Sequence, residues 1–386
     1  MKRVYLDHAA TTPVDGGVLE FLRACQRDLW GNPSSLHWFG RGARAALEEA
    51  RARVARLIGA APGEVFFTSG GTEADNLAVL GCARALGRRG RRHLVTSAVE
   101  HRAVLDPMRR LTAEGFSLTE IPPEASGAAS SGALARALTP HTAFVSLMHA
   151  NNEVGALSNP AALAPLVHAQ GALFHVDAVQ TAGRLPLDVR TMGADLLSFS
   201  AHKMNGPRGI GALYIRRGTP MEPLLEGGGQ ERGLRPGTEA VPLAVAFAGA
   251  FEIARSRAEG EMRRCARLRD MLEAGIRERF PAALINGQGG ERVPHILSVS
   301  FDARSIGADG ELLAVGMDLE GIAVSGGAAC SSGSAQPSHV LRALGRDPDT
   351  ARATLRFSFG RGNTARDVAR ALRALERVMR RMKRSP

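Results

Sequence analysis

A lysine and an aspartate each follow a short apolar run of the sequence, and their side chains could do chemistry together. Lys203 lies in Ser200–Pro207 (SAHKMNGP), just past a predicted buried strand and inside a turn that contains Gly and Pro. Asp177 lies in His175–Gln180 (HVDAVQ), at the carboxyl end of the preceding apolar run. Open parallel sheets bind ligands at the carboxyl ends of their strands, so the amine and the acid are expected at one edge of a sheet.

An amine near a carboxylate at such an edge suggests pyridoxal phosphate. A lysine amine forms a Schiff base with the aldehyde of this cofactor, and a carboxylate keeps its pyridine nitrogen protonated so that the ring can take up carbanion charge. Thr68–Asn76 (TSGGTEADN) adds a Gly pair and hydroxyls at a predicted helix start, where backbone N–H groups favour a phosphate. Taken singly, the lysine strongly favours a solvent-exposed side chain, the aspartate also fits a loop or capping residue, and the Gly pair also fits an ordinary helix cap.

Composition places the chain among ordinary globular proteins. It has 386 residues, 44% hydrophobic and 23% charged, with a net charge of +11, and this length predicts two or three domains. The four cysteines lie far apart with no CxxC pair, which argues against a zinc ribbon, a redox dithiol or a disulfide framework and favours reducing cytosol. The opening residues turn polar too early for a secretory signal, and no apolar run reaches membrane-spanning length.

Alternating short apolar runs and helix-length segments predict an α/β fold with a mostly parallel sheet over about residues 14–250. A long charged helix is expected over 250–280, and strands and helices beyond it predict a separate α+β domain. The strand candidates are Val65–Phe67, Arg92–Ser97, Ala143–Met148, Ala172–Val176, Leu196–Ser200, Gly211–Ile215, Ile296–Phe301, Ile322–Ser325 and Thr354–Ser358.

The end of the chain is strongly basic. From Arg361 to Pro386 there are nine basic residues against Asp367 and Glu376, on a predicted amphipathic helix that begins after Thr364. No aromatic residues interleave with the arginines, so a solvated helix face is favoured over a nucleic-acid site.

Ordered blocks along nearly the whole chain resemble the cysteine desulfurases of the NifS/IscS type, in the class V group of pyridoxal-phosphate enzymes. Their joint order is far more specific than any single motif. The blocks are YLDHAATTP (5–13), GNPSSLH (31–37), TSGGTEADN (68–76), EHRAVL (100–105), MHANNEVG (148–155), HVDAVQ (175–180), SFSAHK (198–203), GGGQERGLRPGT (227–238), SGGAACSSGS (325–334) and LRFSFGR (355–361).

The resemblance implies fold type I, with a seven-stranded, mostly parallel sheet between helices in a large cofactor-binding domain over 14–250. A small α+β domain is implied over 1–13 and 251–386, and it would carry a mobile catalytic loop at about 325–336. The implied reaction converts L-cysteine to L-alanine and leaves a persulfide on Cys330. The sulfur would then pass to an acceptor for iron–sulfur cluster assembly or tRNA thiolation.

Residue roles follow from the same resemblance, with no metal site. Lys203 would carry the cofactor and move the substrate Cα proton, and His101 would stack on the ring and assist as a base. Asp177 would pair with the ring nitrogen and Gln180 with the phenolic oxygen, while Asn152 would lie against ring and substrate. The phosphate would be held by Gly71, Thr72, Ser200 and His202, and by Thr238 reaching the partner subunit of a homodimer. Arg356 and Asn32 would bind the substrate carboxylate.

Cys330 lies in a stretch of Ser, Gly and Ala with little apolar mass, which predicts an exposed and mobile loop. Attack on the substrate sulfur requires its thiolate. Cys25, Cys82 and Cys265 lie in helix-like segments and are expected to be buried and inert. The sequence departs from the family pattern at Ser158, Pro236, His295 and Ala328, where Gln, Ser, Asn and Ser are common.

Two other functions stay open at this point. One is a different enzyme of the same fold, such as a selenocysteine lyase or an aminotransferase, which would not need the mobile cysteine. The other is a non-catalytic scaffold that binds RNA or an assembly partner, although the intact Lys203, Asp177 and His101 argue against it. Direct nucleic-acid binding and membrane binding are not expected, and the sequence does not identify the sulfur acceptor.

Overall fold

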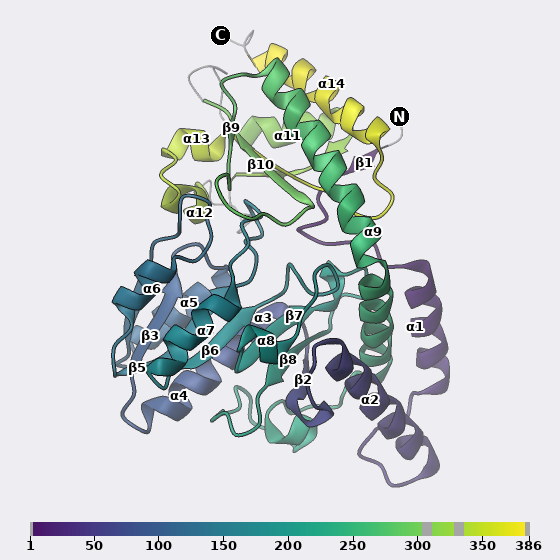
Figure 1. The fold of residues 1–386 in the computed structure, drawn as a ribbon. Coiled ribbons are helices and arrows are strands. Elements are labelled where there is room, and N and C mark those ends of the chain that lie inside the picture. Colours follow the sequence, from purple (N-terminus) through teal and green to yellow (C-terminus); the bar gives the residue numbers. More distant parts are fainter. Residues whose placement is uncertain (1–2, 303–310, 328–335, 383–386) are drawn as a thin grey trace.

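Seven short strands, most of them buried on both faces, form the central sheet of the computed structural model, which describes residues 3–302, 311–327 and 336–382 (Figure 1). β8 runs antiparallel to β7 and β2, and the other neighbouring pairs are parallel. The predicted mostly parallel seven-stranded sheet is therefore confirmed. In spatial order the strands are β2 (Val65–Thr68), β8 (Gly211–Ile215), β7 (Leu196–Ser200), β6 (Leu173–Asp177), β5 (Thr142–Met148), β3 (His93–Ser97) and β4 (Ser117–Ile121).

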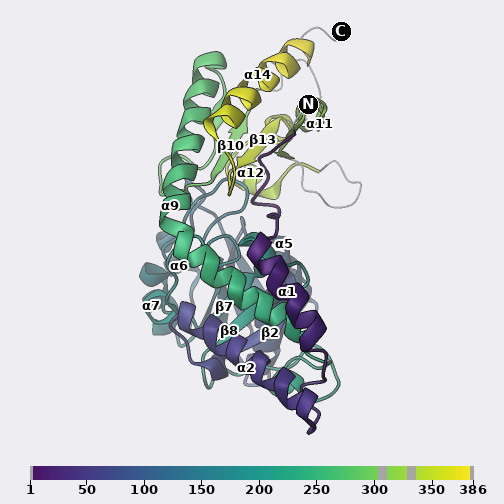
Figure 2. The ribbon, with the colours of Figure 1, turned by 90° about the vertical axis from the view of Figure 1, so that its right-hand side faces the viewer.

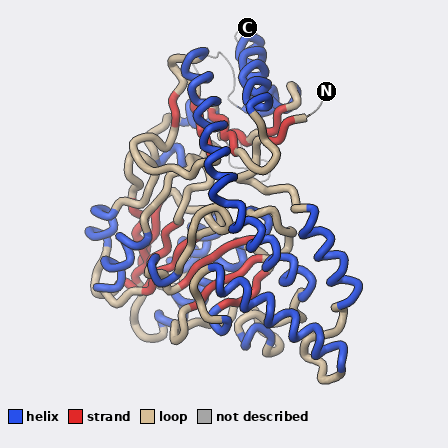
Figure 3. The backbone as a smooth tube through the Cα atoms, turned by 45° about the vertical axis from the view of Figure 1, so that its right-hand side comes forward, coloured by secondary structure: helices blue, strands red, loops and turns tan. Residues whose placement is uncertain are grey.

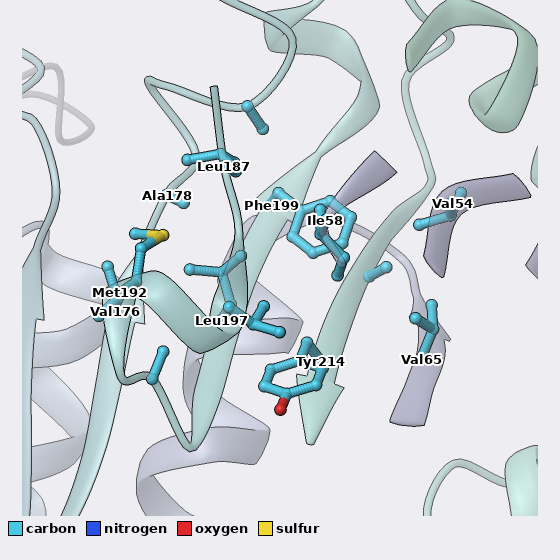
Figure 4. Close-up of a cluster of buried hydrophobic side chains, with 14 of the residues drawn as sticks. Val54, Ile58, Val65, Val176, Ala178, Leu187, Met192, Leu197, Phe199 and Tyr214 are labelled. Carbon is cyan, nitrogen blue, oxygen red and sulfur yellow. The ribbon is translucent and has the colours of Figure 1, made fainter. Parts of the chain in front are cut away.

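Helices cover both faces of this sheet, because successive strand residues point to opposite sides. Phe67 of β2 belongs to the core shared with α2 and α9, whereas its neighbour Phe66 packs with α3, α4 and α5. Figure 4 shows part of the first core, where Phe199 and Tyr214 lie near Ile58. The helices are α1 (Gly16–Asp28), α2 (Trp38–Leu57), α3 (Gly71–Asn76), α4 (Cys82–Gly87), α5 (Arg102–Thr112), α6 (Ser131–Ala137), α7 (Pro160–Ala169), α8 (Val189–Met192) and α9 (Val241–Arg279).

A smaller α+β body lies beyond the sheet, as the sequence predicts (Figures 1 and 2). Its four-stranded sheet has the order β12-β13-β10-β9, and a separate parallel pair joins β1 to β11. The second half of α9 packs against α14, and the two contribute to one apolar core with these strands. The elements are β1 (Val4–Tyr5), β9 (Leu284–Ile285), β10 (Ile296–Ser300), α11 (Glu311–Leu319), β11 (Ile322–Ala323), β12 (Ser325–Gly326), α12 (His339–Ala343), α13 (Pro348–Arg352), β13 (Thr354–Ser358) and α14 (Ala365–Met382).

The two bodies are connected by α9, which runs continuously from one to the other (Figures 2 and 3). Phe247 and Phe251 lie in the core of the larger body, and Leu268 and Leu272 lie in that of the smaller one. Because the helix has no break between these residues, a domain boundary at 250/251 stays a prediction.

Several elements differ from the sequence prediction, and the two-residue strands β1 and β9 were not among the strand candidates. α9 begins at Val241 instead of residue 250, with Pro at its first turn, where the missing N–H costs nothing. The edge strand β4 was not predicted, because its sequence SLTEI is polar and only Ile121 is buried. Among the described residues, no helix combines the length and apolar character that crossing a bilayer requires.

Candidate active site

The carboxyl ends of three parallel strands bring the predicted chemical groups to one edge of the large sheet. β6 ends at Asp177, and the neighbouring β7 ends at Ser200, directly before the short turn η3 (Ala201–Lys203). β5 ends shortly before Asn152. Because β5, β6 and β7 are parallel neighbours, their ends lie side by side at the ligand-binding edge of the sheet.

A cavity of about 430 Å³ opens at this edge. Small-molecule sites typically have volumes of about 300–1,000 Å³. Ser325 and Gly326 of the smaller body form part of the wall, so the cavity lies where the two bodies meet. The predicted site residues that line it are Gly71, Thr72, His101, Asn152, Asp177, Gln180, Ser200, His202, Lys203 and Arg356.

The amine of Lys203 is held inside this cavity by two backbone carbonyls. Its Nζ donates hydrogen bonds to the oxygens of Ala9 (2.6 Å) and Ala10 (2.8 Å). Burial, followed by the positive charges of Arg356 and Arg184, lowers the pKa of Lys203 to about 7. A lysine with such a pKa is partly unprotonated at neutral pH, which is the form that attacks an aldehyde.

Asp177 is a buried carboxyl on the same wall. Its Oδ1 accepts the backbone N–H of Val179 at 2.8 Å. Burial raises the pKa of Asp177, and the Val179 N–H, His101 and Lys203 act in the opposite direction. Burial and the neighbouring Asp177 also raise the pKa of Asp75, which lines the cavity as well. A protonated ring nitrogen beside Asp177 would stabilise its ionised form.

Several polar atoms of the cavity wall fit a phosphorylated ring. Gln180 Oε1 and Ser200 Oγ are buried and have no hydrogen-bond partner in the described part of the chain. Gln180 is oriented by its Nε2, which donates to the Ala9 carbonyl at 2.9 Å. At Gly71, a Cβ atom would come within 2.8 Å of Val179 Cγ2, so only glycine leaves space at this helix start. These residues therefore fit pyridoxal phosphate.

Two histidines of the wall are favoured in their neutral form. His101 caps α5, and its Nδ1 accepts the N–H of Ala103 at 3.1 Å, so in the neutral ring the proton is on Nε2. The ring is accessible from the cavity, yet the surrounding protein displaces enough water to lower the pKa of His101. Burial likewise lowers the pKa of His202 to about 4, with smaller contributions from nearby cations. His202 Nδ1 lies 3.1 Å from Thr11 Oγ1.

Arg356 reaches the cavity from β13. Its Nη1 donates to the carbonyl of Asn152 (2.9 Å), and its Nη2 donates to Asp7 Oδ1 (2.8 Å) and Ser325 Oγ (2.7 Å). Its Nε is buried and has no partner among the described residues. This N–H is therefore an unsatisfied donor beside the cavity, and the planar guanidinium suits a carboxylate.

Three predicted site residues are not part of this cavity. Asn32 and Thr238 are exposed in loops, and neither lines the wall. The Asn32 side chain instead accepts the backbone N–H of Ser34. Cys330 lies outside the described residues. Gly326, two residues before the undescribed segment 328–335, and His339, four residues after it, both line the cavity.

Other polar residues that line the cavity or contact its wall were not assigned from the sequence. Asp7 pairs with Arg356, Asp75 lies near Asp177, and Glu100 is a buried acid whose Oε1 accepts the N–H of Met148 at 2.9 Å. His339 lines the wall and contacts the carbonyl of Glu100 at 2.8 Å. The three acids lie inside sequence blocks that resemble the family, namely Asp7, Asp75 and Glu100. Their presence in these blocks was the sequence feature that could have predicted acids near the site.

Comparisons with known proteins agree with this geometry. A family model described as aminotransferase class-V matches residues 4–371. The cysteine desulfurase IscS of Dictyoglomus turgidum is 42% identical over 384 residues, covering 99% of this chain and 96% of that protein. IscS of Azotobacter vinelandii is 44% identical over 375 residues, covering 96% of this chain and 91% of that protein.

A solved structure of a NifS-like protein superposes with a TM-score of 0.90 at 37% identity, and the match covers 98% of this chain and 99% of that one. Both sequence and structure therefore match over nearly the full length, including the strand ends that form the cavity. The chain belongs to the class V aminotransferase family and, within it, to the cysteine desulfurases of the NifS/IscS type.

Proposed function

We propose that this chain uses pyridoxal phosphate to convert L-cysteine to L-alanine and stores the released sulfur as a persulfide on Cys330. One observation carries the proposal: an amine of lowered pKa, a buried carboxylate and a guanidinium line one cavity. These groups are Lys203, Asp177 and Arg356. The large domain over 14–250 and the small domain over 1–13 and 251–386 are part of the same proposal.

The residues that would hold the cofactor surround the cavity. Lys203 would bond to its aldehyde, Asp177 would pair with the ring nitrogen, and Gln180 would hydrogen-bond the phenolic oxygen. His101 would stack on the ring together with Asn152, and Gly71, Thr72, Ser200 and His202 would bind the phosphate. When bound, pyridoxal phosphate supplies an electron sink that stabilises negative charge at the substrate Cα.

The protein's own groups then bind the substrate and move its protons. Arg356 binds the carboxylate of cysteine through its free Nε edge. Lys203 is suited to accept the Cα proton and return it, because its pKa of about 7 makes both protonation states accessible at neutral pH. His101, with its proton on Nε2, is the candidate acid and base for the sulfur groups.

The sulfur transfer balances without an external oxidant. The Cys330 thiolate attacks the substrate sulfur, an S–S bond forms as the substrate C–S bond breaks, and the substrate carbon receives a proton. The products are L-alanine and the Cys330 persulfide. The positions of Gly326 and His339 on the cavity wall support this role, since these described residues lie within nine positions of Cys330 in the sequence.

A homodimer would bring the remaining predicted residues into use. Asn32 and Thr238 are exposed, and four large apolar side chains near Asn32 are exposed as well: Trp30 64%, Leu36 90%, Trp38 71% and Phe39 43%. Apolar side chains gathered in this way on a surface favour contact with another protein. We propose that a second copy covers them, and that Thr238 reaches the phosphate in the partner's cavity.

The acceptor of the sulfur would be an iron–sulfur scaffold or a tRNA-thiolating enzyme, with no direct binding of nucleic acid. The three cysteines that the structure describes, Cys25, Cys82 and Cys265, are buried free thiols, and this supports a cytoplasmic role. Burial raises their pKa values, which leaves them poor nucleophiles.

The test uses the purified chain loaded with pyridoxal phosphate. With L-cysteine and a reductant it should form alanine and sulfide in equal amounts, and Cys330→Ala should lose both products. Cys265→Ala is the matched control and should keep the activity. Full sulfide release by Cys330→Ala would refute the persulfide step and favour direct lyase chemistry.

The same preparation separates the alternatives. A selenocysteine lyase would prefer selenocysteine strongly over cysteine in kcat/KM, and an aminotransferase would form a keto acid that depends on a second amino acid. A non-catalytic scaffold would show no near-visible absorbance band, whereas the proposed enzyme loses that band in Lys203→Ala. Mixed dimers of Lys203→Ala and Thr238→Ala chains test the shared site. If Thr238 acts in the partner's cavity, one cavity carries both defects and the other is intact, so activity is retained in half of the sites. If Thr238 acts in its own chain, each cavity carries one defect.

A further inference from the structure

Arg184 is a buried arginine behind the cavity, and it contacts the backbone of Lys203. The residue is 9% exposed and follows β6 by a short turn. Its Nη2 donates to the carbonyl oxygens of Lys203 (2.9 Å) and His8 (3.1 Å). Its Nη1 contacts Nε2 of His295, which directly precedes β10 of the smaller body. One guanidinium therefore joins three distant segments of the chain.

These contacts lie at both ends of the hydrogen bond that holds the lysine amine. Lys203 Nζ donates to the carbonyl of Ala9, the residue next to His8. Arg184 fixes the backbone of Lys203 on one side of this bond and the backbone of His8 on the other. A shift of its guanidinium would change the placement of the amine relative to its acceptors.

The charge of Arg184 is balanced only in part, by Glu261, which acts on it without forming an ion pair. No carboxylate among residues 3–302, 311–327 and 336–382 forms an ion pair with it, and its partners are two carbonyls and a histidine. Burial lowers the pKa of Arg184 to about 10, so it stays protonated at neutral pH. Arg356 also faces Lys203, but its charge is offset by Asp7 at 2.8 Å.

We propose that Arg184 is a positioning residue for Lys203: it holds the lysine and its carbonyl acceptors in register, and its unpaired positive charge favours the neutral form of the amine. The inference deepens the proposed function, in which Lys203 carries the cofactor and moves the Cα proton. Arg184 would then act on the reaction through Lys203, without contacting the cofactor or the substrate.

Several charged and titratable groups act on the two residues. Lys203 interacts with Arg356 from β13, Asp177 from β6 and Asp7 after β1, and also with His101 and the adjacent His202. The groups around Arg184 are His8, Cys265, Glu261 and His295. Burial lowers the pKa of His8 to about 3 and that of His295 well below its usual range, so near neutral pH these two rings do not titrate.

A purely structural arginine would make a different prediction. If Arg184 only satisfied carbonyls, its replacement would lower stability without a specific effect on the lysine amine. Arg91 provides the matched control, because it also binds three backbone carbonyls, those of Thr142, Gln170 and Gly171, away from the cavity.

The composition of the chain makes the amine directly observable. The sequence contains only three lysines, Lys2, Lys203 and Lys383. Full-length protein freed of cofactor and labelled with ¹³C at lysine Cε should give three NMR signals, and loss of one in Lys203→Ala assigns Lys203. Titration between about pH 5 and 11 then gives the midpoint of that amine.

We expect Arg184→Met to raise the midpoint of Lys203 by about one pH unit, which is about a tenfold change in the ratio of protonated to neutral amine. Arg184→Lys keeps the charge and should titrate close to wild type. Arg184→Gln keeps a donor for the Lys203 carbonyl without the charge, and should behave like Arg184→Met. If Arg184→Met does not fold, as judged by circular dichroism, the test is the difference in the Lys203 midpoint between Arg184→Gln and Arg184→Lys.

An unchanged midpoint in the uncharged variants would overturn the inference, as would an equal shift in Arg91→Met. A separate readout isolates the proposed function. Wild-type protein is mixed with pyridoxal phosphate, reduced with borohydride and analysed by peptide mass spectrometry. Absence of the label on Lys203 would refute the proposed function, whereas a labelled Lys203 with an unshifted midpoint in Arg184→Gln would refute only the role of Arg184.

Discussion

Arg356 should determine the affinity for the substrate carboxylate and little else, and substitutions at this residue can be evaluated from its contacts. Its Nη1 is held by the Asn152 carbonyl, Nη2 is shared by Asp7 and Ser325, and the buried Nε has no partner among the described residues. A carboxylate at the Nε and Nη2 edge would receive one charge-assisted hydrogen bond from Nε and a second from Nη2 once it displaces Ser325 Oγ, which also donates to Asp7 at 2.8 Å. Two variants, Arg356→Lys and Arg356→Met, test this contact.

The expected magnitude follows from these two hydrogen bonds. Each contributes about 1.5 kcal/mol or more to binding, so losing both in Arg356→Met should cost about 3 kcal/mol, or about 100-fold in KM. Arg356→Lys keeps one donor and should raise KM about tenfold. Since the carboxylate is bound equally in ground and transition state, kcat should change much less than KM.

Arg356→Met also leaves Asp7 beside the incoming carboxylate without its partner. The repulsion adds to the loss, and Asp7→Asn in the same chain should recover part of it. The assay measures alanine formation against L-cysteine concentration, and it measures binding of cysteamine, which lacks the carboxylate, by the change in cofactor absorbance. Cysteamine affinity should be nearly the same in wild type and Arg356→Lys. Equal losses for cysteine and cysteamine would refute the assignment, because the arginine would then act on the site as a whole.

Further outcomes follow from other buried groups. Arg51 and Glu231 pair at 2.7 Å with side chains only 3% and 2% exposed, so Glu231→Ala should lower the free energy of unfolding by about 3–5 kcal/mol. In the double variant Arg51→Met with Glu231→Leu, denaturant titration should show that most of the lost free energy of unfolding is recovered. Equal losses in the single and double variants would contradict the argument that the unpaired buried charge causes the loss. Gly71→Ala would place a Cβ 2.8 Å from the nearest side chain and should weaken cofactor binding, measured by dialysis, whereas Gly63→Ala, with nothing within 4 Å, should not. The lowered pKa of Lys203, about 7 against 10.5, means that the unfolded chain binds more protons between these values, so stability of the cofactor-free protein should rise with pH there by up to about 1.4 kcal/mol per unit. Lys203→Met should remove this slope in denaturant titrations, and an unchanged slope would contradict the lowered pKa.

The sequence predicted the chemical edge of the sheet because the residues there follow a simple pattern. Asp177 and Ser200 end apolar runs, and parallel strands place such ends together. The same logic did not detect β4, because an edge strand buries little and shows no continuous apolar run. The role of Cys330 stays a prediction, since that residue lies outside the described part of the chain.

The contacts that tune the amine had no comparable signal in the sequence. Arg184 binds two carbonyls and His295, and carbonyl groups are present at every residue, so their use as partners is decided only by the three-dimensional fold. In the sequence, His295 was visible only as a departure from the family pattern. Its contact with Arg184 had no signal in the sequence, because that contact depends on the packing of the smaller body against the larger one.

Residues 7–12 explain why the properties of Lys203 depend on both bodies. Leu6 accepts the N–H of Ser358 in the smaller body, whereas the N–H of Thr12 donates to the carbonyl of His202 in the larger one. Between these anchors, Ala9 and Ala10 supply the carbonyls that hold the lysine amine. A rotation of one body against the other must therefore displace these acceptors or break one anchor. The hydrogen bonds of Lys203 are thus set by the packing of the whole chain as much as by the residues of the cavity wall.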